Sequence, residues 1–81
     1  GTIQTLTQST NVNSNAILLS SVTHASLKDL ILINTYDGIK MSNCIDVLIC
    51  DCSFTGHENA AIELPAGTVF HDLTIENCEF R

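Results

Sequence analysis

The sequence predicts an all-β solenoid, a chain that winds through stacked coils of short strands. The first observation is an internal repeat, because residues 46–54 (DVLICDCSF) and residues 72–80 (DLTIENCEF) share the pattern Asp, apolar, x, Ile, x, x, Cys, x, Phe. The second is the alternation of apolar and polar residues within these copies, which is the side-chain period of a β-strand. No stretch shows the i, i+3, i+4, i+7 apolar spacing of a capped helix. Units that recur at a fixed interval indicate a repeat architecture.

Length and composition limit the classes of protein that the chain can belong to. It has 81 residues, of which 44% are hydrophobic and 15% charged, so it is one globular unit or part of one. No apolar run approaches the roughly 18 residues of a membrane-spanning segment. The net charge is −6 and the cations are Lys28, Lys40 and Arg81. Binding nucleic acid requires clustered cations, so the sequence also excludes that partner.

The conserved spacing within the repeat predicts which residues stack on one another. A weaker copy at residues 29–37 (DLILINTYD) aligns with the other two when Asp29, Asp46 and Asp72 are superimposed. In this alignment Asn34, Asp51 and Asn77 fall at a tight turn, where Asn and Asp are favoured. The predicted inward rows are Leu30/Val47/Leu73, Leu32/Ile49/Ile75, Thr35/Cys52/Cys78 and Phe54/Phe80.

A second repeated unit lies between these copies. It occurs at residues 15–20, 37–42 and 60–65. In each copy two apolar residues are expected to point inward, and the residue between them is expected to point outward. Each coil therefore has three short strands, and residues 15–81 form the coils. Residues 1–14 are rich in Thr, Gln, Asn and Ser and form a partial first coil or an N-terminal cap. Their apolar anchors are Ile3, Leu6 and Val12, the inward rows of the second unit are Ile17/Ile39/Ile62 and Leu19/Met41/Leu64, and its outward row is Leu18/Lys40/Glu63.

The segments GIKMSNCIDVLICDCSF and AAIELPAGTVFHDLTIENCEF resemble coils of the right-handed parallel β-helix, the fold of the pectate-lyase-like superfamily. The resemblance covers about residues 15–81. It implies about three coils of 17–26 residues, each with three short strands. The alternative fold is a leucine-rich repeat, because Leu27-x-x-Leu30-x-Leu32 and its later copies match that motif. Uneven spacing of the copies counts against the alternative.

The resemblance implies a function that is mechanical. Among β-helices the chain looks most like a segment of a bacteriophage tailspike or appendage. This implies a structural and adhesive part of a virion or extracellular fibre, homotrimeric, with lateral loops that contact a host surface polysaccharide. A short solenoid exposes apolar residues and strand edges at its ends, so we expect a fragment of a longer β-helix or an oligomer. The alternatives are part of a polysaccharide lyase or glycoside hydrolase of the same fold, and a leucine-rich protein-interaction module.

The hydrolase alternative needs a pair of carboxylates on one solvent face. Glu63 is the outward residue of its strand, and Glu58 in the loop before it is the nearest second carboxylate. Glu63 also stacks beside Lys40, so a surface ion pair explains it without catalysis. The adjacent His57 lacks a second histidine four residues on, where Ala61 stands, so the two-histidine zinc motif is absent. The sequence favours a segment that is not itself an enzyme, with Glu58 and Glu63 as the only catalytic candidates.

The four cysteines predict neither a metal site nor a disulfide framework. Cys50 and Cys52 are one residue apart, which is not a zinc-ligand spacing, and the turn residue Asp51 separates them. We expect Cys52 and Cys78 to be stacked inward thiols. Cys50 is expected to be replaceable, with Ile33 and Glu76 as its repeat equivalents. The recurring Asp29, Asp46 and Asp72 are interpreted as turn-capping residues rather than calcium ligands, so no metal or cofactor is predicted.

Overall fold

A computed structural model describes residues 1–5 and 7–81 of the chain, so the expected anchor Leu6 lies outside the described residues. The fold is all-β, and its strands form three sheets in which every pair is parallel. Sheet A contains β1 (Thr2–Gln4), β4 (Ile31–Ile33), β7 (Ser53–Thr55) and β10 (Glu79–Phe80) in that order. Sheet B contains β2 (Asn15–Ser20), β5 (Asp37–Ser42) and β8 (Ala60–Glu63). Sheet C contains β3 (Thr23–Lys28), β6 (Cys44–Cys50) and β9 (Phe70–Glu76).

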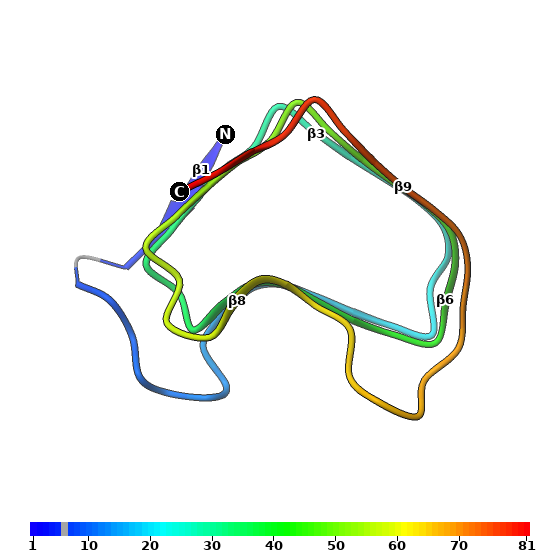
Figure 1. The fold of residues 1–81 in the computed structure, drawn as a ribbon, viewed down its shortest axis with the longest axis horizontal. Coiled ribbons are helices and arrows are strands. Elements are labelled where there is room, and N and C mark those ends of the chain that lie inside the picture. Colours follow the sequence, from blue (N-terminus) through cyan, green and yellow to red (C-terminus); the bar gives the residue numbers. More distant parts are fainter. Residues whose placement is uncertain (6) are drawn as a thin grey trace.

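The chain visits the three sheets in the order B, C, A and then begins the next coil. Figure 1 looks along the stacking direction, and the successive coils overlie one another as closed outlines. Two loops bulge from the common outline, a blue one before β2 and a yellow-orange one between β8 and β9. Three coils and the preceding strand β1 are thus stacked along the shortest dimension, in a body of 33 × 26 × 16 Å. The predicted three strands per coil are confirmed.

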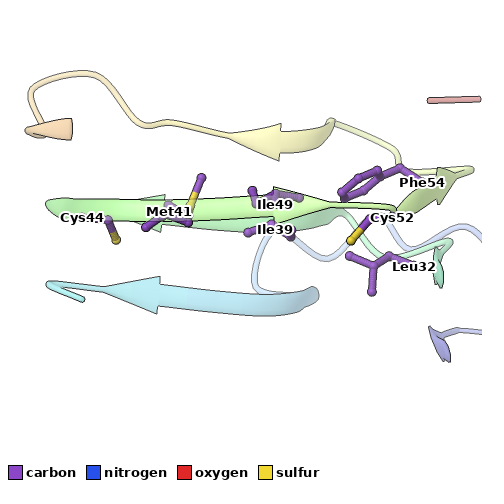
Figure 2. Close-up of a cluster of buried hydrophobic side chains, with 8 residues drawn as sticks. Leu32, Ile39, Met41, Cys44, Ile49, Cys52 and Phe54 are labelled. Carbon is purple, nitrogen blue, oxygen red and sulfur yellow. The ribbon is translucent and has the colours of Figure 1, made fainter. Parts of the chain in front are cut away.

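The core lies inside the outline and is concentrated in the middle coil. Among the described residues eight apolar side chains are buried, and Figure 2 shows them. Seven belong to the middle coil, and Leu32 belongs to β4 of the first coil. The first and last of them in the chain are Leu32 and Phe54, both with no exposed surface. The full set is Leu32, Ile39, Met41, Cys44, Val47, Ile49, Cys52 and Phe54.

The strand register confirms some of the predicted rows. Ile39 pairs with Ile17 and Ile62, Leu19 pairs with Met41, and Phe54 pairs with Phe80. The rings of Phe54 and Phe80 stack with centroids 5.1 Å apart and planes within 9°. Leu64 follows the end of β8 and is 43% exposed, so it does not complete the Leu19/Met41 row as a buried residue.

The predicted alignment of the first coil is wrong by five residues. Val47 pairs with Ala25 and Leu73, and Ile49 pairs with Leu27 and Ile75, so Leu30 and Leu32 do not belong to those rows. Leu30 instead precedes β4 as Cys52 precedes β7, and Leu32 pairs with Phe54. Thr35 is therefore not the equivalent of Cys52. The equivalents of Cys50 are Lys28 and Glu76 rather than Ile33 and Glu76.

Backbone conformation explains the error. Among residues 1–5 and 7–81, nine non-glycine residues have positive φ, between 51° and 69°, and they recur at equivalent places in successive coils. Asx side chains tolerate this left-handed region better than other residues do. Asp29 occupies such a position at the turn after β3, whereas Asp46 occupies a different one inside β6. The columns are Ser21/Asn43, His24/Asp46/Asp72, Asp29/Asp51/Asn77 and Asn34 with Gly56.

The leucine-rich alternative does not match this architecture. Such a repeat supplies one strand followed by a helix or 3₁₀ segment. The described residues contain three strands per coil and no helix of any length. It follows that no helix in this part of the chain has the length and apolarity needed to cross a bilayer.

Candidate functional site

The most concentrated group of polar side chains lies where the chain turns from sheet A into sheet B. We call it the corner cluster: Thr35, Asp37, His57, Asn59 and Glu63. Thr35 lies in the turn before β5 and Asp37 is the first residue of β5, and the other three belong to the equivalent turn and strand one coil later. Thr35 is 4% exposed and Asp37 only 1%. Buried polar groups need hydrogen-bond partners, so the partners define what this cluster does.

The His57 ring bonds to the coil before it. Its Nδ1 lies 2.9 Å from the backbone oxygen of Thr35 and 3.1 Å from the Thr35 hydroxyl. Its Nε2 lies 3.1 Å from the backbone oxygen of Leu32. The ring also meets Phe54 edge to face, with centroids 6.1 Å apart. Both ring nitrogens therefore face groups of the preceding coil, and the ring is half-buried within the loop between β7 and β8.

Asn59 and Asp37 form the second bridge of the cluster. The Asn59 side-chain amide donates to Asp37 Oδ1 at 2.9 Å and to Glu63 Oε2 at 3.4 Å. Gly38 lets the two coils approach here, because a Cβ on it would lie 2.4 Å from the Ala61 backbone oxygen. The cluster thus joins the middle coil to the third coil through side chains as well as through strand pairing.

The hydroxyl beside an imidazole invites comparison with a nucleophile and its general base. A base of that kind is oriented by a third group, commonly a carboxylate, on its second nitrogen. Here the second nitrogen of His57 faces the Leu32 carbonyl instead. The Thr35 hydroxyl donates to the Asp37 backbone oxygen at 2.8 Å and is almost fully buried. The arrangement therefore stabilises the coils and does not present a nucleophile to solvent.

The two catalytic candidates lie at different levels of exposure. Glu58 is exposed in the turn before β8 and Glu63 is half-buried at the end of that strand. Glu63 pairs in register with Lys40, as the sequence predicts, but the expected ion pair between them is not among those formed by the described residues. No pocket opens beside either carboxylate in the part of the chain that the structure describes. The structure therefore brings Glu63 next to Asn59 and Lys40, and gives Glu58 no bonded partner among the described residues.

A second polar group lies on the outer face of sheet C. His24 Nδ1 and Asp46 Oδ2 are 2.6 Å apart, with both side chains mostly exposed, and Asp72 continues the column one coil later. The sequence alignment missed His24 because it placed Asp29 there. The 22-residue offset that relates Ile17 to Ile39 also relates His24 to Asp46, and would have identified the pair.

The turn column after sheet C changes the acidity of two groups. The Asn77 amide donates to Asp51, and this hydrogen bond, with a second from Cys50, holds the pKa of Asp51 below its ordinary value. The hydrogen bond between Cys50 and Asp51 is also the main cause that raises the pKa of the Cys50 thiol. Desolvation and the negative charges of Asp51 and Glu76 make smaller contributions. Cys50 is consequently kept as a thiol rather than activated as a nucleophilic thiolate.

The other three cysteines share one structural arrangement. Each sulfur lies 3.3–3.4 Å from the carbonyl two residues before it and 3.7–3.8 Å from a carbonyl of the preceding coil. Burial is the main cause that raises the pKa of Cys52. All four cysteines are free, and no three metal-ligating side chains come together among residues 1–5 and 7–81. Thiols of this kind behave as small buried apolar groups with weak hydrogen bonds. The three residues are Cys44, Cys52 and Cys78.

Comparison with known proteins gives no relative to argue from. The chain matches no protein-family model, no curated protein and no solved structure.

Proposed function

We propose that the chain is a segment of a right-handed parallel β-helix that serves as a stiff structural rod in an extracellular or virion fibre. The parallel three-sheet stack supports this class of fold. Its lateral loops and the outer face of sheet C are the surfaces available for contact with a host polysaccharide. The sequence resemblance to a bacteriophage tailspike segment implies a lateral trimer of such rods, and the sedimentation experiment below tests this assembly against end-to-end stacking.

The observation that carries the proposal is how the polar side chains are used. The contacts of His24, His57, Asn59 and Asn77 each link one coil to the next, with partners 22–26 residues away. A side-chain link between neighbouring repeats adds to the nearest-neighbour coupling on which solenoid stability depends. Groups that are occupied in this way resist shear between coils. That use of polar residues favours a mechanical role over a catalytic one.

The experiment compares glycan cleavage with glycan binding. The chain is incubated with bacterial capsule and lipopolysaccharide glycans, and new reducing ends are measured beside equilibrium binding. A rod yields no reducing ends, whether or not a glycan binds. Cleavage that disappears in Glu63→Gln but persists in Glu79→Gln, a matched change on β10, would overturn the structural proposal in favour of the hydrolase.

A further inference from the structure

We propose that a second copy of this chain stacks end to end on the first, pairing its β2 and β3 with β8 and β9. The inference rests on the rod proposed above and names its partner. In the described residues β2 and β3 are paired on one edge only, and so are β8 and β9. An unpaired strand edge is a template for another strand. The first coil and the third coil therefore expose edges of the same kind on opposite ends of the stack.

The two ends are complementary because the coils repeat in register. Val47 lies between Ala25 and Leu73, so one further step of the same register places Ala25 of a second copy against Leu73. The same step places Leu27 of the second copy against Ile75, which is 42% exposed in the single chain. Apolar rows that are covered on one side only would thus be covered on both.

Charge matches at this junction. Lys28, Cys50 and Glu76 form one outward row, so the second copy's Lys28 falls beside Glu76. Asp72 follows Asp46 in its column, and neighbouring carboxylates repel each other. The second copy's His24 falls beside Asp72 and supplies a contact of the type already formed with Asp46.

Sheet A requires one strand to move. Ile3 of β1 pairs with Leu32, and Phe80 of β10 pairs with Phe54 from the other direction. In the stacked pair, β10 of the first copy and β1 of the second copy would both pair with the same edge of the second copy's β4. All three residues of β1 are exposed, whereas Phe80 brings a ring that stacks on Phe54. We assign the edge to β10, so β1 is displaced when two copies join.

The resulting contact joins two different surfaces. Such head-to-tail contacts do not close on themselves when the step is a translation, and they generate open chains. The mean mass therefore rises steadily with concentration, whereas a lateral trimer stops at three copies.

Sedimentation velocity of the 81-residue chain over a range of concentrations tests this. We expect reversible species whose mean mass keeps increasing. Lys28→Glu or Glu76→Lys alone should raise the concentration for association about tenfold, since an attraction becomes a repulsion. The double variant should restore association. Lys40→Glu changes the net charge as Lys28→Glu does, but lies on β5, which is paired on both edges, and should leave association unchanged.

Three results would overturn the inference: a monomer at every concentration, a closed trimer, or single charge variants that associate like the unmodified chain. Circular dichroism on the same samples separates this failure from failure of the rod. A cooperatively folded β protein that stays monomeric keeps the rod and rejects the stacking. A chain without cooperative β structure rejects both.

Ile3→Asn, which weakens the pairing of β1 with β4, should favour association.

Discussion

The middle coil and the third coil have nearly the same apolar residues but different burial. Ile49 in the middle coil has no exposed surface, whereas its register partner Ile75 in the third coil is 42% exposed. Phe54 has no exposed surface and Phe80 is 55% exposed, although the two rings stack directly. Burial in this fold therefore depends on having a coil on each side, and residue type alone does not determine it. Identical substitutions in the two coils should have unequal effects.

The largest difference is expected for the two phenylalanines. Phe54→Ala removes a ring that is covered on both sides and should lower the free energy of unfolding by about 3–5 kcal/mol. Phe80→Ala loses the stacking contact and part of its burial, so about 1–2 kcal/mol is expected. Urea denaturation followed by circular dichroism measures both. Equal losses for the two variants would contradict the comparison.

The next effect concerns the close approach of the middle and third coils at Gly38. In Gly38→Ala the new Cβ would meet the Ala61 oxygen at 2.4 Å and a Phe54 ring carbon at 2.8 Å. The backbone oxygen cannot rotate away, so the coils must separate, and we expect a loss of about 1–3 kcal/mol. Gly67→Ala is the control, because its Cβ meets nothing and only its φ of +82° is strained. That variant should lose about 1 kcal/mol. A thermal melt in which Gly67→Ala is the less stable variant would be the contrary result.

The cysteines sharpen the comparison between inward and outward positions of one coil. Cys52→Ser buries a hydroxyl in place of a thiol that is 2% exposed, and should cost about 1–3 kcal/mol. Cys50→Ser changes an outward position whose register partners are Lys28 and Glu76, so stability should be nearly unchanged. Denaturation under reducing conditions measures both variants. Stoichiometric zinc in a metal assay would contradict the structural role of these thiols.

The smallest effect is a pH dependence at the turn between sheets C and A. The lowered pKa of Asp51 means that its contribution to stability is present above the unfolded-state pKa and is lost as the pH falls through the folded-state value. Asn77→Gly removes the donating amide and suits the positive φ of 51°. The pKa of Asp51 should rise in this variant, and its stability deficit should shrink in acid. Carbon NMR titration of the carboxyl group measures the shift, and an unchanged pKa would rule out the Asn77 contact as its cause.

The sequence predicts the coil architecture correctly where each residue type occupies only one kind of position in the coil. Alternation and the phenylalanine and isoleucine rows identified the second and third coils. It failed in the first coil because aspartate serves two left-handed positions, one inside a strand at Asp46 and one at a turn at Asp29. A local pattern cannot distinguish them, whereas the regular offset of sheet B does.

Much of the corner cluster could not be predicted from the sequence. His57 and Thr35 are 22 residues apart, and nothing local indicates that the ring folds back onto the preceding turn. Asp37 was recognised only as the start of a strand, although it is almost fully buried. Such contacts depend on the position of each turn relative to the equivalent turn of the preceding coil, and that position is determined only when the coils stack. Glu63 beside Lys40 was predictable, because strand register alone determines it.

The strand pairing has a consequence for how the chain folds. Partners in sheet B, such as Asn15 and Asp37, are separated by 22 residues, and the sheets formed by the described residues contain no hairpin. Each pairing must therefore close a long loop, and the chain loses the entropy of that loop before any strand pairing compensates for the loss. We expect a slow nucleation step in which two coils form together, followed by faster addition of the third. Refolding should then be slow for a chain of this length.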